Sequence, residues 1–253
     1  MQHTKVPGFR IGTIMKNFII QEQGQTLLSL STITPWRFKL KNGTFLDAAL
    51  SLTSSSVHRE GDFQIFSYEY TADQDALQAK RTIITAGEHT GFIVDQIHTK
   101  EAVSVHADFC FQNPNGTAWC NVPDKHRIVG RCQDLGFKHF RLEAQAGQND
   151  ILNSAGLLLP YRIDDQKNIH YSMYEGLYNY QHDHFTCYSY CTHRSDEIKT
   201  WHMKQIDDHY VVEPSKLYEG WIMTLNKDSI TVYNKLNDAQ KITTKLSPNP
   251  LCP

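Results

Sequence analysis

The densest group of side chains that could do chemistry lies between Tyr178 and Arg194, in the stretch YNYQHDHFTCYSYCTHR. It holds four tyrosines, three histidines and two cysteines. Imidazoles and phenols can transfer protons, and tyrosine rings can stack on a sugar while their hydroxyls bind its edges. The stretch therefore indicates a sugar site, a metal site, or two ordinary strands that are rich in tyrosine.

A period of two decides which of these side chains share a face of a strand. If the stretch, extended upstream to Ile169, forms two strands joined near Gln181–His184, each strand places its even-numbered members on a single face: Tyr174, Tyr178, Tyr180, His184, Tyr188 and Tyr190. Phe185, Cys187 and Cys191 point the other way. We predict an aromatic face with polar tips that binds a saccharide. The alternative is that these tyrosines fill a half-buried sheet surface, as tyrosines commonly do.

Chemistry at a uronic acid needs a base and a group that neutralises the carboxylate. His58 with Arg59, His106 with Asp108, and His126 with Arg127 are sequence neighbours that could supply these groups. The alternative is a structural role, because a chain with 13 histidines contains such pairs by chance. We predict catalytic roles for His106, His184 and Tyr188, and substrate binding by Tyr174, Tyr178, Tyr180, Tyr190, His182 and Arg194.

His182, Asp183 and His184 are also suitable ligands for zinc. In a strand, however, the two histidines oppose Cys187 and Cys191, so one ion could not collect both sets, and a solvated turn is the alternative. We expect no metal and no cofactor. The chain has no G-x-S-x-G elbow and no Walker or Rossmann glycine pattern, so nothing supports a serine hydrolase, a kinase or a dehydrogenase.

The elements that must position these residues are strands. Short runs of apolar and β-branched residues alternate with polar ones and end at Gly, Asn or Asp, as in WRFKLKNG, FQIFSYEYT and SITVYNKL. Asn42-Gly43 between two alternating runs is the strongest hairpin signal. We predict an all-β chain with few short helices, folded as one large antiparallel β-sandwich domain over residues 1–253.

Charge and composition exclude several classes of partner. The 25 basic and 27 acidic residues give a net charge of -2 without long runs of one sign, which argues against nucleic acid. No apolar stretch reaches the length of a membrane-spanning helix, and the first residues lack the apolar centre of a signal peptide. We therefore expect a soluble, cytoplasmic protein with no membrane partner, in which the six cysteines are mostly free thiols.

One segment of the chain resembles a known family. Residues 77–111, LQAKRTIITAGEHTGFIVDQIHTKEAVSVHADFCF, contain a strand with Lys-Arg, a strand ending in Val-Asp, and a strand that opens near His106. This order is similar to that of the C-terminal β-supersandwich of heparinase II/III-type polysaccharide lyases, over about residues 60–115. The resemblance implies a supersandwich-like fold and a protein that handles acidic saccharides.

The chain departs from that family at its start. The family's lyases carry a helical toroid that supplies catalytic Tyr and His residues, whereas this chain begins with strand-like sequence, so none of the family's catalytic residues is carried over. We expect a freestanding supersandwich, half of a split enzyme with a helical-toroid partner chain, or a relative that uses its sheet differently. The function alternatives are a lyase-like or epimerase-like protein acting on uronic-acid saccharides, and a non-catalytic module for sugar binding or for assembly with a partner chain or as a homo-oligomer.

Overall fold

The computed structural model describes residues 10–14, 17–22, 25–46, 50–72, 76–87, 90–112, 117–122, 127–132, 138–145, 157–166, 168–174, 180–193, 201–207, 209–214, 220–226 and 228–246. The described residues contain strands and turns and no helix, so the prediction of an all-β fold is confirmed. Among these residues, no helix is present that is long and apolar enough to cross a membrane.

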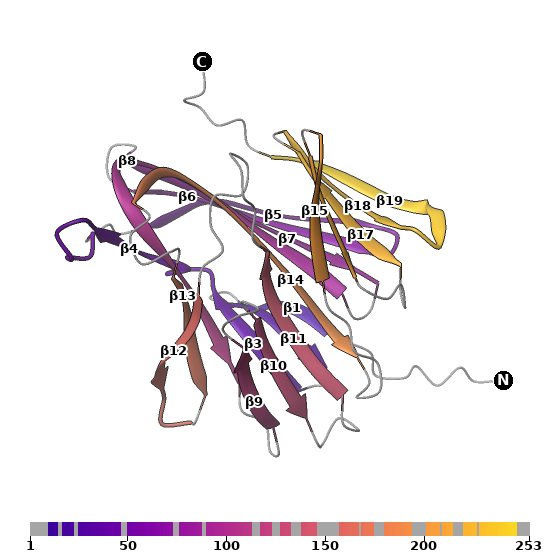
Figure 1. Cartoon of the computed structure of the whole chain (residues 1–253), viewed down its shortest axis with the longest axis horizontal. Helices are drawn as coiled ribbons and strands as arrows, with labels where there is room; N and C mark the ends of the chain where they lie inside the picture. Colours follow the sequence, from indigo (N-terminus) through magenta and orange to yellow (C-terminus); the bar gives the residue numbers. More distant parts are fainter. Residues whose placement is uncertain are drawn as a thin grey trace.

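The strands form two antiparallel sheets (Figure 1). The larger sheet contains β1 (Arg10–Ile14), β2 (Asn17–Glu22), β3 (Gln25–Ser31), β4 (Trp36–Leu40), β5 (Ser51–Glu60), β6 (Phe63–Ala72), β7 (Leu77–Ala86), β8 (Thr90–Phe111), β9 (Thr117–Val122), β10 (Arg127–Cys132), β11 (Lys138–Gln145), β12 (Leu157–Ile163), β13 (Ile169–Tyr174) and β14 (Gln181–His193). The smaller sheet contains β15 (Trp201–Ile206), β16 (His209–Pro214), β17 (Trp221–Leu225), β18 (Ser229–Asn234) and β19 (Asn237–Lys245).

The 22-residue strand β8 organises the larger sheet. Its first half pairs with β7 on one side and β14 on the other. Its second half pairs with β4, β13 and β3. The sequence predicted a strand ending in Val-Asp and a separate strand opening near His106, and this detail is wrong, because a single strand runs from Thr90 to Phe111. Figure 1 shows β8 and β14 curving strongly together at the upper left.

Two hydrophobic cores lie on opposite faces of β6, β7, the first half of β8, and β14. The first core joins these strands to β2–β4 and to the second half of β8; its residues include Phe18, Leu28, Trp36, Phe38, Tyr68, Tyr70, Ile83, Ile93, Phe109, Phe111, Tyr188 and Tyr190. The second core joins them to the smaller sheet; its residues include Phe63, Ile65, Ile84, Phe92, Val94, Cys187, Cys191, Val212, Trp221, Met223, Val232 and Ile242. The molecule therefore has a middle layer that is covered on both sides.

The period of two in the sequence explains this arrangement. Along the first half of β8, Phe92 and Val94 pack in the second core, whereas Ile93 and Ile97 pack in the first. A strand that is apolar on both faces is stable only where both faces are covered, because each buried large side chain contributes about 1.5–3 kcal/mol. Strand β8 therefore belongs in the middle layer.

The predicted hairpin at Asn42-Gly43 is confirmed. Gly43 has a φ of 88°, a left-handed conformation that glycine adopts without strain. The Asn42 side chain accepts hydrogen bonds from the backbone amide and the hydroxyl of Thr44. After the turn, Phe45 forms a bridge with Lys39, so the hairpin carries Phe45 back alongside β4.

Candidate functional site

The tyrosine-rich stretch forms the strand β14 in its described part. The predicted turn at Gln181–His184 is wrong, because the strand begins at Gln181 and has a bulge between Gln181 and Asp183. The predicted alternation is correct: Tyr188 and Tyr190 lie in the first core, and Cys187 and Cys191 lie in the second. Period two thus separates the two sets of side chains.

The predicted open tyrosine platform needs correction at its centre. Tyr188 is 1% exposed and Tyr190 is 0% exposed, because β2–β4 and the second half of β8 cover this face of β14. Burial raises the pKa of the Tyr190 phenol and, on the opposite face, the pKa of the Cys187 thiol. These two tyrosines are core residues, and a ligand cannot reach them in this arrangement.

The other predicted site residues are dispersed. His184 is buried, Tyr180 is half-buried and His182 is exposed. Tyr174 belongs to β13, where it pairs with His106 on β8. Tyr178 and Arg194, and with them His126 of the predicted acid–base pairs, lie outside the described residues. The structure therefore brings together His106 and Tyr174, but not the full set.

The Lys-Arg and Val-Asp strands of residues 77–111 meet in a buried ion pair. Arg81 on β7 donates to Asp95 on β8 through Nε at 2.7 Å and Nη2 at 2.6 Å, and the Trp36 indole donates to the same carboxylate at 2.8 Å. The Arg81 guanidinium also lies 4.8 Å from the Trp36 ring centroid. Burial by itself lowers the pKa of Arg81, but the attraction and hydrogen bonding of Asp95 raise it overall. Arg81, Asp95 and the Trp36 indole thus form one buried, hydrogen-bonded group at the first core.

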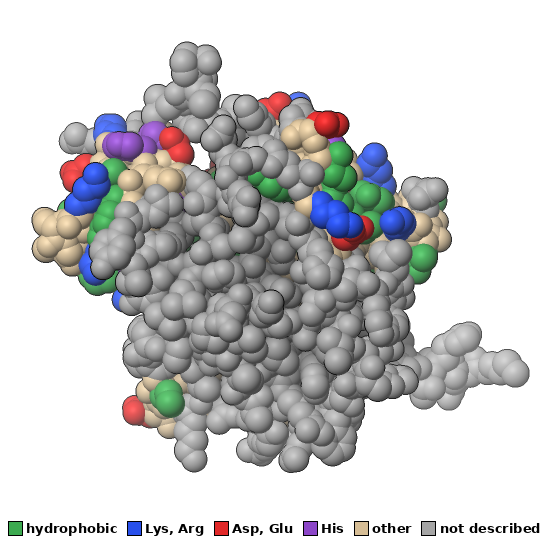
Figure 2. Space-filling view, in the orientation of Figure 1, with side chains coloured by type: hydrophobic (Ala, Val, Ile, Leu, Met, Phe, Trp, Pro, Cys, Tyr) green, Lys and Arg blue, Asp and Glu red, His purple; other side chains and the backbone are tan. Residues whose placement is uncertain are grey.

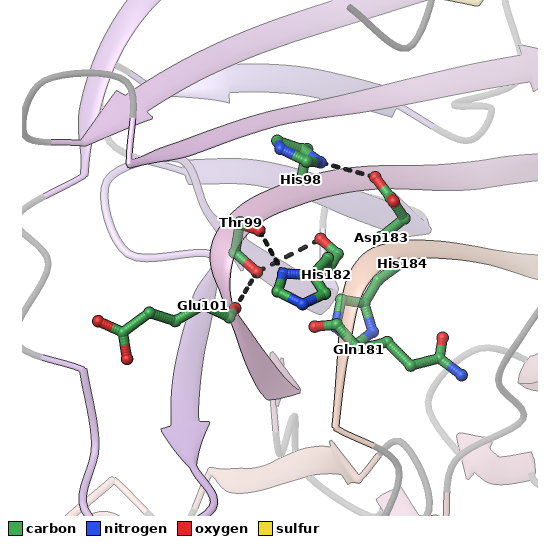
Figure 3. Close-up of polar contacts among 7 residues, drawn as sticks. All are labelled: His98, Thr99, Glu101, Gln181, His182, Asp183 and His184. Atoms are coloured by element: carbon green, nitrogen blue, oxygen red, sulfur yellow. Dashed lines mark hydrogen bonds and ion pairs between the residues drawn. The ribbon is translucent and has the colours of Figure 1, made fainter. Parts of the chain in front are cut away.

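A second polar cluster lies where β8 and β14 bend (Figure 3). His98 donates from Nδ1 to the Asp183 carboxylate at 2.7 Å, and His182 donates from Nδ1 to the Thr99 carbonyl at 3.1 Å. The Thr99 hydroxyl donates to the Glu101 carbonyl at 2.6 Å. These bonds tie the bend of β8 to the bulge of β14.

The geometry of this cluster does not suit a metal ion. Figure 3 shows His182 and His184 directed to different backbone carbonyls, and His184 Nε2 lies 3.1 Å from the Gln181 carbonyl oxygen. Within the described ranges, no group of three or more His, Cys, Asp or Glu side chains could hold a metal. Figure 2 shows histidines beside acidic and basic side chains at the upper left, over the region where β8 and β14 bend in Figure 1. The cluster is a polar surface.

A third group of side chains combines a cation with an open aromatic ring. The Arg37 guanidinium lies 5.4 Å from the centroid of the Phe45 ring, and its Nη2 lies 3.2 Å from Asp108 Oδ1. Phe45 is 49% exposed, and its ring meets the buried His106 ring edge-on at 5.5 Å. We call Arg37, Lys39, Phe45, His106 and Asp108 the Arg37–Phe45 surface.

Alternation along β4 produces this surface. Trp36 and Phe38 are buried in the first core, so Arg37 and Lys39 lie on the opposite face of the strand. Arg37 pairs with His106 on β8, and His106 pairs with Tyr174 on β13, so these three residues form one row across three strands. The guanidinium, stacked on the ring and held by Asp108, can bind an anionic group.

The sequence predictions included His106, Asp108 and Tyr174 but missed Arg37 and Phe45. Arg37 and Asp108 are 71 residues apart, and no short motif links them. The available signal was the Asn42-Gly43 hairpin, which folds the residues after the turn beside Arg37 and Lys39.

Of the other predicted pairs, His58 is exposed on β5, where its Nε2 lies 3.4 Å from a Glu60 carboxylate oxygen. Cys110, Cys187 and Cys191 are free thiols, as predicted for most of the six cysteines.

Comparison with known proteins relates the chain to structures rather than to sequences. No family model matches it, and no curated protein matches its sequence. The crystal structure of heparinase III is similar with a TM-score of 0.51 and 13% identity, covering 90% of this chain and 35% of that chain. The heparan sulfate lyase HepC from Pedobacter heparinus has a TM-score of 0.48 and 8% identity, covering 92% and 36%. The chain thus spans about a third of the length of these proteins.

The likeness to heparinase III concerns the fold. The identity is 13%, so the likeness shows a shared fold and nothing more. The resemblance to heparinase-type lyases that residues 77–111 indicate is therefore confirmed at the level of the fold. Function must be argued from the sites.

Proposed function

We propose that the chain binds an acidic saccharide, of the uronic-acid class, on the Arg37–Phe45 surface. The observation that carries the proposal is the Arg37 guanidinium stacked at 5.4 Å on a Phe45 ring that is 49% exposed. An open aromatic ring can stack on the apolar face of a sugar. A guanidinium beside it binds carboxylate or sulfate groups in a bidentate manner.

The neighbouring residues support this role. Asp108 holds the Arg37 side chain, which is 38% exposed and so remains accessible to a ligand. Lys39 pairs with Phe45 across the hairpin, and Lys41 is exposed in the turn, so further positive charge is close to the ring. The fold shared with heparinase III supplies the ligand class to the proposal, since that enzyme is named for an acidic glycan.

The proposal is tested by calorimetric titration of the full chain with heparin oligosaccharides and, for comparison, with neutral oligosaccharides of equal length. We expect binding of the acidic ligand that weakens with added salt, because exposed charges are screened. Arg37→Ala should weaken binding about tenfold or more, since a hydrogen bond to a charged group contributes about 1.5–3 kcal/mol. Phe45→Ala should weaken binding severalfold.

Two variants on β19 and its turn serve as matched controls. Lys241→Ala removes an exposed cation and Leu236→Ala removes an exposed apolar side chain, both far from the proposed surface in sequence. Neither should change the affinity. The proposal would be contradicted if the control variants lost as much affinity as the site variants, or if neutral and acidic oligosaccharides bound equally well.

The row Arg37–His106–Tyr174 favours a second candidate, β-elimination. In that reaction a base takes the proton from C5 of the uronic acid, the C4–O bond breaks, the leaving oxygen takes up a proton, and a C4–C5 double bond forms. Arg37 would neutralise the carboxylate and His106 would be the base. His106 is 1% exposed beneath Phe45, so the binding function is better supported. This candidate would be established if the wild-type chain formed unsaturated product and the His106→Gln variant did not.

A further inference from the structure

Strand β5 is exposed along its whole length. All ten of its residues are exposed, on both faces of the strand. Its neighbour β6 contributes residues to both hydrophobic cores, but β5 contributes to neither. Among the described strands only β6 pairs with β5, so the backbone donors and acceptors on the other side of β5 form an open sheet edge.

The register with β6 shows which part of β5 is regular. A bulge lies between Leu52 and Ser54, and from Ser54 to Glu60 each residue pairs with β6 without a shift. The midpoint of this regular segment is Val57, which is 54% exposed. Val57 pairs with Phe66, a residue of the first core, so it lies on the face of the sheet that carries this core.

The charges on β5 differ from those on β19, an edge strand of the smaller sheet. Strand β19, at the edge of the smaller sheet, carries the exposed lysines Lys241 and Lys245. Lysines on an edge strand oppose pairing with another chain. The segment Ser54–Val57 of β5 has no charged residue, and its three serines are small enough to let a second backbone approach.

We propose that two copies of this chain pair antiparallel along β5, related by a two-fold axis at Val57. A two-fold axis perpendicular to the sheet joins the same face of both copies. This requires that odd-numbered residues pair with odd-numbered residues and even-numbered residues with even-numbered ones. With the axis at Val57 the regular segment is used in full. Val57 then faces its own copy, Ser56 faces His58, Ser55 faces Arg59, and Ser54 faces Glu60.

This register is self-complementary. It places an apolar pair at the centre, where two half-exposed valine side chains leave water, and no two like charges directly opposite each other. It joins the middle layers of two molecules into one continuous sheet, with backbone hydrogen bonds along both copies of β5. A second copy presents the same unshifted segment from Ser54 to Glu60, so every contact that one copy of β5 makes is repeated by the other.

The test is the mass of the full chain measured by sedimentation equilibrium over a range of concentrations. We expect a reversible dimer of about twice the 29.1 kDa chain mass. Val57→Lys places two like charges opposite each other and should produce a monomer with an unchanged circular dichroism spectrum. Thr243→Lys on β19 is the control and should remain dimeric.

Cross-linking tests the register. Residues directly opposite in an antiparallel pair have Cα atoms about 4.5–5.5 Å apart. A disulfide spans Cα separations of about 4.4–6.8 Å, so Val57→Cys should form a covalent dimer under mild oxidation, whereas wild type and Thr243→Cys should not. A monomeric wild type at all concentrations, or a dimer that persists in Val57→Lys, would overturn the proposal.

Discussion

At the scale of single residues, the feature with the largest expected effect on stability is the ion pair between Arg81 and Asp95. Both side chains are almost fully buried, at 2% and 3% exposure, and their contact is bidentate. The Trp36 indole gives the carboxylate a third hydrogen bond. A buried charge is tolerated only when it is paired, so each partner depends on the other.

We predict that Asp95→Asn lowers the free energy of unfolding by about 3–5 kcal/mol, because it leaves the Arg81 charge buried without a counter-ion. The measurement is equilibrium unfolding in urea. The matched control is Glu69→Gln, which breaks the pair at 3.3 Å between the half-exposed Glu69 side chain and Lys80 and should cost less than about 1 kcal/mol. If both variants lost a similar amount of unfolding free energy, the prediction that burial makes the Arg81–Asp95 pair more important than the Glu69–Lys80 pair would be wrong.

At the scale of elements, the contact between β8 and β14 depends on a glycine. Gly91 is the register partner of Tyr190, and a Cβ atom at Gly91 would overlap the Tyr190 ring. The missing side chain therefore makes room for a fully buried tyrosine. This pairing fits the ring into the first core between the middle layer and the strands that cover it.

We predict that Gly91→Ala destabilises the protein by about 1–3 kcal/mol, the usual cost of overpacking a core. The double variant with Tyr190→Leu should recover part of this loss, because the smaller side chain leaves space for the new methyl group. A double-mutant cycle measured by urea unfolding checks the coupling. Strictly additive effects of the two substitutions would argue against the contact.

At the scale of the whole molecule, the two-sided burial of the middle layer fixes how stability depends on pH. Burial raises the pKa of Tyr190 above its ordinary value of 10.0, and the same cause is the largest of those that raise the pKa of Tyr70. The folded protein thus holds these phenols in their neutral form, and only the unfolded chain ionises them readily. Their contribution to stability is full below about pH 10 and is lost as the pH rises further.

We predict that the melting temperature falls above about pH 10 and that tyrosinate absorbance from the buried phenols rises only as the protein unfolds. The measurements are thermal unfolding at a series of alkaline pH values and ultraviolet titration. Tyr190→Phe removes one of these phenols and should make the melting temperature fall less steeply with pH. An unchanged slope in this variant would contradict the assignment.

Local patterns in the sequence determined the fold class and the alternation of each strand. Period two in β4, β6 and β8 predicted strands, and Asn42-Gly43 predicted the hairpin from the left-handed conformation that glycine allows. The sequence also predicted that Tyr188 and Tyr190 lie on the opposite face from Cys187 and Cys191, because even- and odd-numbered residues of a strand point to opposite sides. These features depend on residues that are close together in the chain, so a single sequence contains the information.

Only the tertiary structure decided which faces are open. Parity shows that Tyr188 and Tyr190 share a face, but the burial of that face comes from β2–β4 and the second half of β8, which are distant in sequence. The same long-range pairing brings Arg37 to Asp108 and His98 to Asp183, across 71 and 85 residues. A strand's sequence sets which side chains point together, whereas burial and charge pairing depend on the layer that packs against it, and that layer is set by the energy of the whole fold.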